Sequence, residues 1–100
     1  MRVVWTKAAD SNLQAIYDYI AQTSVDYARR MIERITDRSP QIGAFPMAGR
    51  TVPEFQVGQL REVFEHPYRI IYRIRPDRID IIAVVHMSRH LDTNNPPQIN

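Results

Sequence analysis

Apolar residues recur every three or four positions over two stretches in the first half of the chain. This period places apolar side chains on one face of an α-helix, so the pattern predicts two amphipathic helices. The first runs from an N-cap at Thr6 to about Gln22, and residues 23–26 break the pattern and supply capping side chains for the second. The turn is short, so the helices should form an antiparallel hairpin. The apolar positions are Ala9, Leu13, Ile16, Tyr17 and Ile20 in the first helix, and Ala28, Met31, Ile32, Ile35 and Ile42 in the second.

The rest of the chain shows strand patterns. Residues 2–5 are apolar and β-branched, which indicates a short first strand, whereas residues 43–58 hold all three glycines and two prolines and predict an irregular connection. Three strands should follow at residues 60–65, 68–74 and 79–86, joined by short turns into an antiparallel meander. The last of them is apolar on both faces, which favours an interior place in the sheet. Its expected alternation groups Ile82, Val84 and His86 against Ile81, Ala83 and Val85.

The middle strand of the meander decides how the layers should pack. Tyr68, Ile70, Tyr72 and Ile74 share one face, and Arg69, Ile71 and Arg73 share the other. The helical hairpin needs an apolar surface, so we expect it to cover the first face and to leave the arginine face bare for a partner. The predicted fold is therefore α+β: a short N-terminal strand, then an antiparallel two-helix hairpin packed on one face of a small antiparallel sheet (β-α-α-β-β-β).

Composition and length point to one folded domain. The chain has 100 residues, of which 44% are hydrophobic and 24% charged. We expect a single domain over residues 1–91 and a flexible tail over residues 92–100, which are polar and contain prolines. No long apolar run or signal-peptide pattern is present, so we expect a cytoplasmic protein without a membrane partner.

The residue types also restrict the chemistry. The chain has no cysteine, which excludes disulfides and thiolate ligands. His66, His86 and His90 lack the spacing of a metal site, and the glycines form no phosphate-binding loop, so we expect neither metal nor cofactor.

The positive charges are of an unusual kind. Net charge is only +2, which argues against a protein that coats duplex DNA, yet every cation except Lys7 is an arginine. Arginine is suited to phosphate and carboxylate recognition. A GC-rich genome would produce the same bias, so arginine usage alone leaves both explanations open.

Several sequence motifs occur in a characteristic order. They are Val4-Trp5-Thr6, Asp18-Tyr19-Ile20, Phe45-Pro46, Gly49-Arg50, Val52-Pro53-Glu54, Leu60-Arg61-Glu62, residues 67–73, and residues 82–86 with Arg89. In this order, from residue 3 to about 91, the chain resembles the RelE/ParE toxin superfamily of type II toxin–antitoxin systems. The resemblance implies a toxin that halts growth when released from its cognate antitoxin. The superfamily holds two activities on one scaffold: RelE-like members cleave mRNA in the ribosomal A site, and ParE-like members poison DNA gyrase.

The resemblance also implies candidate residues for the nuclease activity. Arg69 lies where the nucleases place a phosphate-stabilising arginine, His86 where some place a general acid or base, and Glu62 is a partner base, with Glu54 and Glu65 as alternatives. Each also has a structural interpretation. Arg69 would pair with Glu62 or Glu65 across the strands, His86 would be a half-buried strand residue, and Tyr68 and Tyr72 would be core aromatics.

Two departures from the nuclease pattern favour the ParE-like branch. The strand at residues 60–65 carries one cation and two carboxylates, which oppose charge stabilisation of a phosphodiester. Residues 87–91 contain no aromatic side chain that would stack on a base. We therefore favour inhibition of DNA gyrase, with ribosome-dependent mRNA cleavage as the alternative. An inactive module that persists as an antitoxin-bound co-repressor is the third hypothesis.

The partners follow from the same resemblance. We expect a cognate antitoxin, gyrase (or the ribosome and mRNA in the alternative), and operator DNA bound only through the antitoxin. The residues predicted to contact the target or the antitoxin are Arg61, Tyr68, Arg69, Arg73 and Arg89.

Overall fold

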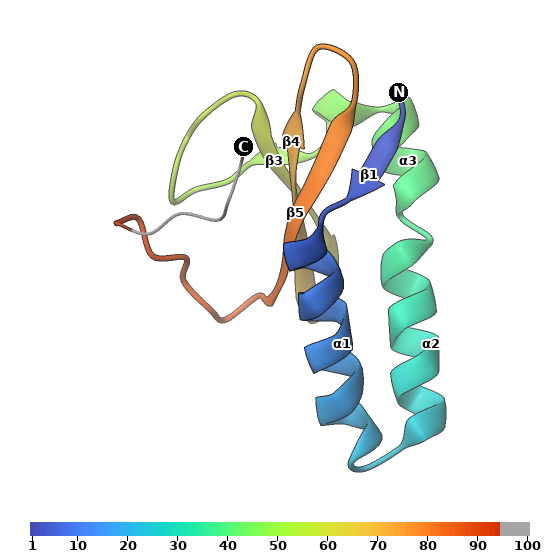
Figure 1. Ribbon diagram of the computed structural model, residues 1–100. Helices are drawn as coiled ribbons and strands as arrows, with labels where there is room; N and C mark the ends of the chain where they lie inside the picture. The colour runs from blue at the N-terminus through green and yellow to red at the C-terminus, as the bar shows by residue number, and fades with distance from the viewer. Residues whose placement is uncertain (95–100) are drawn as a thin grey trace.

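The computed structural model describes residues 1–94, and most of the tail expected at residues 92–100 lies outside the described residues. The elements follow the predicted order of strand, helices and strands, and the α+β fold class is confirmed (Figure 1). The elements are β1 (Val3–Trp5), α1 (Lys7–Ala21), α2 (Val25–Thr36), α3 (Ser39–Ala44), a 3-10 turn (Pro46–Ala48), β2 (Arg50–Thr51), β3 (Leu60–Glu65), β4 (Tyr68–Ile74) and β5 (Ile79–His86). Within this part of the chain, no helix has the length and hydropathy needed to span a membrane.

Side-chain caps set where the hairpin helices begin. The Thr6 hydroxyl accepts a hydrogen bond from the Ala9 amide at 3.2 Å and donates one to the Ile81 carbonyl at 2.7 Å. The first of these bonds confirms the predicted cap, and the second ties the start of α1 to β5. Ser24 caps α2 through the Tyr27 amide at 3.1 Å.

The second predicted helix is shorter than expected. Ile42 does not extend the apolar face of α2, because α2 ends at Thr36 and Ile42 belongs to the separate helix α3. Pro40 explains the break, since proline lacks the amide that an α-helix interior requires and is tolerated only in a first turn. Ile42 is nevertheless fully buried.

The sheet has the order β1-β5-β4-β3-β2. The meander of β3, β4 and β5 is confirmed, and β5 lies inside the sheet as predicted. Two features go beyond the sequence pattern. The two-residue strand β2 lies within the connection expected to be irregular, and β1 pairs with β5 in parallel, with Val3 opposite Ile79 and Trp5 opposite Ile81.

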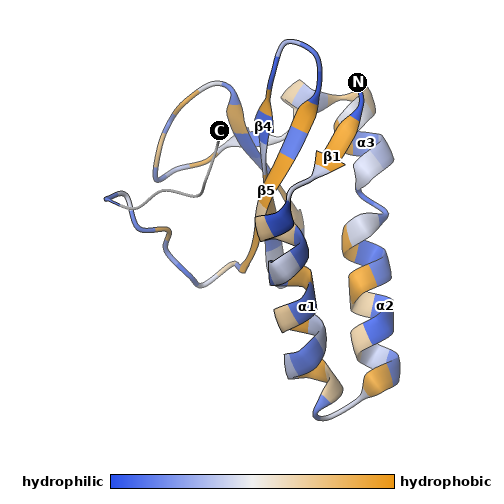
Figure 2. Ribbon diagram, viewed as in Figure 1, coloured by the Kyte–Doolittle hydropathy of each residue, from blue (hydrophilic) through white to orange (hydrophobic). Residues whose placement is uncertain are grey.

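Apolar side chains are buried on both faces of the sheet. Between the sheet and the helices lie Ala9, Met31, Ile35, Ile42, Tyr68, Ile70, Tyr72, Ile79, Ile81 and Val84. On the reverse face lie Val52, Leu60, Ile71, Ile82, Ala83 and Val85, with Phe55 and Leu91 packed against them. The hydropathy colours in Figure 2 agree with this distribution: polar and apolar positions alternate along α1 and α2, and β5 is largely apolar.

The expectation that the arginine face is bare is therefore wrong. Ile71 is fully buried and Arg69 is only 4% exposed. The cause lies in β5, whose reverse face is apolar as well, so the β2–β3 loop and the segment after β5 fold across it to remove that surface from water.

The expected alternation in β5 is also wrong at one point. Ile71 pairs with Ala83 and Tyr72 with Ile81, which leaves Ile82 without a partner in β4. Such an extra residue is a β-bulge. As a result Ile82 joins Ala83 and Val85 on the reverse face, instead of facing the helices with Val84.

Candidate functional site

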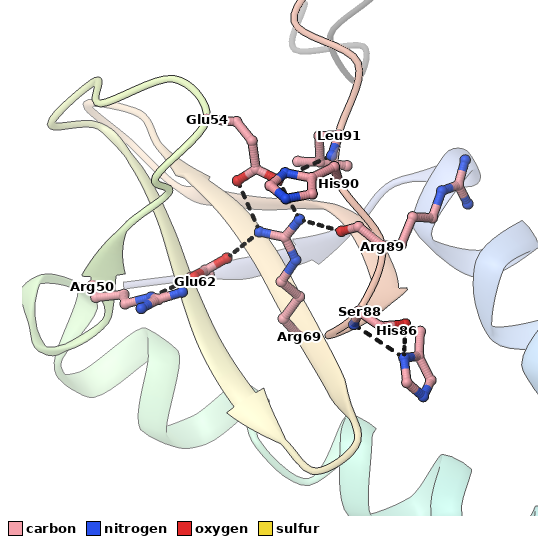
Figure 3. Close-up of polar contacts among 9 residues, drawn as sticks. All are labelled: Arg50, Glu54, Glu62, Arg69, His86, Ser88, Arg89, His90 and Leu91. Carbon is pink, nitrogen blue, oxygen red and sulfur yellow. Dashed lines mark hydrogen bonds and ion pairs between the residues drawn. The ribbon is translucent and has the colours of Figure 1, made fainter.

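A buried arginine forms the centre of the reverse face. The Arg69 side chain, on β4, is 5% exposed, and its guanidinium donates to both oxygens of Glu54 at 3.1 and 2.6 Å and to Glu62 at 2.9 Å (Figure 3). Glu62 reaches Arg69 diagonally across neighbouring strands, because the residue directly opposite Arg69 on β3 is Phe64. Glu54 approaches from the β2–β3 loop.

The same arginine holds the segment that follows β5. Its second terminal nitrogen donates to the Arg89 carbonyl at 2.8 Å, and Glu54 accepts the Leu91 amide at 2.9 Å. We call this set the Arg69 clasp: the side chains of Arg69, Glu54 and Glu62 with the backbone of Arg89 and Leu91. It joins β3, β4, the β2–β3 loop and the C-terminal segment at one point.

The Glu54 carboxylate of the clasp is kept charged. The hydrogen bond from Arg69 is the largest cause that lowers the pKa of Glu54 from 4.5 to about 2, against the opposing effect of burial. The same bond raises the pKa of Arg69. Glu62 is fully buried and is bound by a second cation, Arg50, at 2.5 Å. Two carboxylates thus face two guanidinium groups, and the buried charges are compensated.

A small depression of about 140 Å³ opens beside the clasp. Glu54, Arg69 and His90 are among the residues that line it, and the Nδ1 atom of His90, whose side chain is 94% exposed, lies 3.8 Å from the Glu54 carboxylate. Arg50 stacks over the Phe64 ring on another side, 4.8 Å from its centroid. Glu54, His90 and Arg69 thus bring a carboxylate, an imidazole and a guanidinium to one depression. Among residues 1–94, no three side chains of metal-ligating type gather together.

His86 does not join Arg69 and Glu62. It pairs with Tyr68 across the strands, edge to face with ring centroids 5.7 Å apart, so it lies on the helix side of the sheet. Arg69, next to Tyr68 in β4, points to the opposite side (Figure 3). The His86 ring is exposed rather than half-buried, and its Nδ1 atom accepts the Ser88 amide at 3.1 Å.

The five residues predicted to contact a target or antitoxin do not share one surface. Arg61 turns back on its own chain and donates to the carbonyls of Gly58 and Gly49, both at 3.0 Å. Tyr68 is a buried core aromatic, as its structural interpretation predicts. Arg73 lies half-buried on the Arg69 side, and its Nε atom has no hydrogen-bond partner within the described residues. Of the five, only Arg89 presents an exposed side chain.

The sequence pattern pairs Arg69 with Glu62 or Glu65, and the structure shows the pair with Glu62. Of the residues that line the depression, Arg69 and Arg89 are predicted site residues, and Glu54, Arg50 and His90 have no predicted place there. The sequence pattern leaves Glu54 among several carboxylates without a defined place, includes Arg50 only in a motif, and gives His90 no role once a metal site is excluded. No local pattern predicts that residues 52–58 fold across the sheet. The one available signal was the apolar reverse face of β5, which needed covering.

Comparisons with known proteins agree with this architecture. The family model of the ParE toxin of the type II toxin–antitoxin system parDE matches residues 3–91. The toxin RelE2 of Caulobacter vibrioides is 35% identical over 89 residues, which cover 88% of this chain and 97% of that protein.

Solved structures share the fold. The chromosomal ParDE system of P. aeruginosa superposes with a TM-score of 0.72 at 24% identity, over 86% of this chain and 95% of that one. The RelBE2 toxin–antitoxin complex of Mycobacterium tuberculosis gives 0.64 at 17% identity, over 85% of this chain and 95% of that one. With the family model matching nearly the whole described chain, the protein belongs to the ParE toxins of type II toxin–antitoxin systems, within the RelE/ParE superfamily.

Proposed function

We propose that this toxin inhibits DNA gyrase and is not a nuclease of the kind that Arg69, His86 and Glu62 would form. The observation that carries the proposal is the state of Arg69. A phosphate-stabilising arginine must offer donors to the developing charge. Arg69 is buried and directs its terminal nitrogens at two carboxylates and a carbonyl, and His86 lies on the other face of the sheet. Arg69 is thus a structural residue, and the exposed Arg89 beside it is the cation available to a target.

The test compares the two activities in parallel. Purified toxin is added to gyrase in a plasmid supercoiling assay and to translating ribosomes in a toeprinting assay. We expect loss of supercoiling and intact mRNA. Arg89→Ala should weaken gyrase inhibition by about tenfold or more, whereas Arg30→Ala, an exposed arginine on α2, should leave it unchanged. Cleaved mRNA with normal supercoiling would overturn the proposal.

One observation favours ribosome-dependent mRNA cleavage as a second candidate. Glu54, Arg69 and His90 border the same depression. In that reaction Glu54 would take the proton of the ribose 2′-hydroxyl, and the oxygen would attack phosphorus. Protonated His90 would give its proton to the departing 5′-oxygen, leaving a 2′,3′-cyclic phosphate. The pKa of Glu54, about 2, makes its carboxylate a weak base, which ranks this candidate second. Loss of mRNA cleavage in His90→Ala but not in His86→Ala would support it.

We further propose that a cognate antitoxin binds and neutralises this toxin in the cytoplasm and supplies the contacts to operator DNA. Support comes from the two structural neighbours, described as a ParDE system and as a RelBE2 toxin–antitoxin complex. The candidate is the product of the adjacent reading frame, which we expect to be short and acidic with a DNA-binding N-terminus. Co-expression should restore growth and yield a copurifying complex. Growth arrest that persists despite co-expression would contradict the assignment.

A further inference from the structure

A hollow of about 360 Å³ lies where α3 and the turn after it meet the outer edge of β3. We call it the α3 cavity. Ile42 and Val63 line it with apolar side chains, and Phe45 and Phe64 line it with aromatic rings. Its volume and its apolar walls are those of a binding pocket. Arg50 and Phe64 also line the depression beside the clasp, so the two hollows adjoin.

Exposed apolar side chains lie at the α3 cavity and beside it. Phe45 is 66% exposed, and Met47, on the same turn, is also largely exposed. Phe64 remains accessible although Arg50 stacks over its ring. Neighbouring exposed apolar side chains mark interaction sites, and phenylalanine, methionine and arginine are enriched in the cores of protein interfaces. The composition of this surface is therefore that of an interface.

Two arginines give the α3 cavity a positive charge. Arg50 binds Glu62 through its Nε atom at 2.5 Å, and its two terminal nitrogens have no hydrogen-bond partner among residues 1–94. Arg38 donates from one terminal nitrogen to the Phe64 carbonyl, and its other terminal nitrogen has no hydrogen-bond partner in the same part of the chain. Glu62 is the one carboxylate among the described residues that line the cavity, and Arg50 and Arg69 already neutralise it. The cavity therefore favours an occupant that carries a carboxylate.

The place of the cavity in the sheet decides how an occupant binds. β2 pairs with β3 only at Arg61 and Glu62, and beyond this pair the Phe64 carbonyl is bound by Arg38. A charged side chain at a strand edge prevents the addition of another strand. An occupant of the α3 cavity must therefore bind through its side chains.

The surface suits a protein better than a nucleic acid. A phosphate backbone is bound by a strongly basic face. Here Arg38 and Arg50 pair with the carboxylates of Glu65 and Glu62, and the other walls are largely apolar. An acidic protein segment with an apolar side chain matches both features.

We propose that the α3 cavity binds an acidic segment of DNA gyrase, which places an apolar side chain against Phe45 and Val63 and a carboxylate against Arg50. This proposal rests on the proposed inhibition of gyrase and adds the surface and the chemistry of the segment. The adjoining depression is lined by Arg89, the cation proposed above to face the target. Arg89, Arg50 and the α3 cavity would then form one continuous surface for gyrase.

The test measures binding of full-length toxin to purified gyrase holoenzyme by biolayer interferometry, beside the supercoiling assay. Ala48→Trp fills the cavity from an exposed position, and Ala44→Trp places the same side chain at an exposed position of α3 that does not line it. Phe45→Ala removes an exposed ring and is the second variant, with folding checked by urea unfolding. Ala48→Trp and Phe45→Ala should each raise Kd by at least about tenfold, and Ala44→Trp should leave it unchanged.

Two results separate this proposal from the proposed function. Equal gyrase binding by wild type, Ala48→Trp and Phe45→Ala would overturn the α3 cavity as the surface and leave gyrase inhibition standing. A wild-type toxin that neither binds nor inhibits gyrase would overturn both.

The carboxylate contact has its own test. Binding of wild type should weaken as the ionic strength rises, because salt screens exposed charges. Arg50→Gln should raise Kd and flatten this dependence, whereas Arg50→Lys, which keeps the charge, should retain the dependence. The same dependence in Arg50→Gln as in wild type would overturn the contact.

Other occupants of the cavity give different results with the same variants. Each variant is titrated with the product of the adjacent reading frame and with duplex DNA, and its self-association is measured by sedimentation. If Ala48→Trp loses one of these interactions while its binding to gyrase is intact, the cavity belongs to that partner and the proposal is overturned.

Discussion

Arg69 and Glu54 form a two-point ion pair beneath the surface of the reverse face, in which each terminal guanidinium nitrogen donates to one carboxylate oxygen, at 3.1 and 2.6 Å. Such fork-to-fork pairs are strong and directional. This one lies between residues 15 positions apart in the sequence, and it fixes a loop that no regular secondary structure holds. The stability of the reverse face therefore depends on it.

Arg69→Ala should destabilise the fold strongly. The substitution leaves Glu54 and Glu62 buried without their shared cation, and removal of one member of a buried pair costs about 3–5 kcal/mol. Urea unfolding followed by circular dichroism at pH 7 measures the loss. Arg29→Ala is the control, because its ion pairs with Asp26 and Glu33 are exposed. A loss no larger than that of the control would show that the clasp does not stabilise the protein.

Acid should release the clasp through Glu54. Its pKa is lowered from 4.5 to about 2 in the folded state, so its contribution is present above pH 4.5 and is lost as the pH falls toward 2. A shift of this size corresponds to about 3 kcal/mol. Glu54→Gln should therefore be less stable than wild type at pH 7 and nearly equal to it at pH 2. Unfolding free energies across this range test the claim, and a constant difference would contradict it.

Gly49→Ala should be destabilising for steric reasons alone. A Cβ atom there would lie 2.2 Å from the Tyr72 hydroxyl and 2.9 Å from the Glu62 carbonyl. Tyr72 cannot move freely, because it is fully buried and its hydroxyl donates to the Pro46 carbonyl at 2.6 Å. We expect a loss of about 1–3 kcal/mol in thermal or urea unfolding. Gly58→Ala, which meets nothing within 4 Å, should leave stability unchanged or slightly raised, and equal effects would refute the steric account.

Thr6→Ala should cost more than Ser24→Ala, although both residues cap a helix. Ser24 supplies only its cap, worth about 1 kcal/mol. Thr6 supplies a cap and a bond to the Ile81 carbonyl, which ties α1 to the sheet. We expect the Thr6 variant to lose about 2 kcal/mol in urea unfolding. A valine at position 6 should show the same loss, since it keeps the shape of threonine without its hydroxyl, and retention of stability would contradict the argument.

The sequence pattern predicted most of the framework. The cap at Thr6, the hairpin and the three-strand meander all arise from local periodicity and turn chemistry, which depend on neighbouring residues. The cap at Ser24 lies within residues 23–26, which the pattern assigned to capping without choosing among them. The break before α3 was missed, although Pro40, which cannot continue a helix, is a local signal for it. The parallel pairing of β1 with β5 had no such signal, because residues 3 and 79 meet only through the overall topology.

The candidate site was harder to predict because it depends on contacts between distant segments. Strand alternation favoured a pair between Arg69 and Glu62 or Glu65, and the structure shows the pair with Glu62. The alternation did not separate this pair from His86, which lies beside Tyr68 on the helix side of the sheet. The burial of Arg69 depends on Glu54 and Leu91, which arrive from a loop and from the segment after β5. Neither carries a periodic signal, so an arginine face that looked open in the pattern is covered in the structure.

The β-bulge at Ile82 divides β5 into two halves that run in different directions. An extra residue bends a strand and increases its twist, and in β5 it falls one residue after the last pair with β1. The half of β5 before Ile82 pairs with β1 on one side and β4 on the other. The half after Ile82 pairs with β4 and contacts α1. Deleting Ile82 would restore strict alternation without changing which way any later side chain faces. The deletion would remove the bend that the bulge introduces into β5. A change of one residue would therefore alter the direction of the second half of β5 and leave the rest of the sheet unchanged.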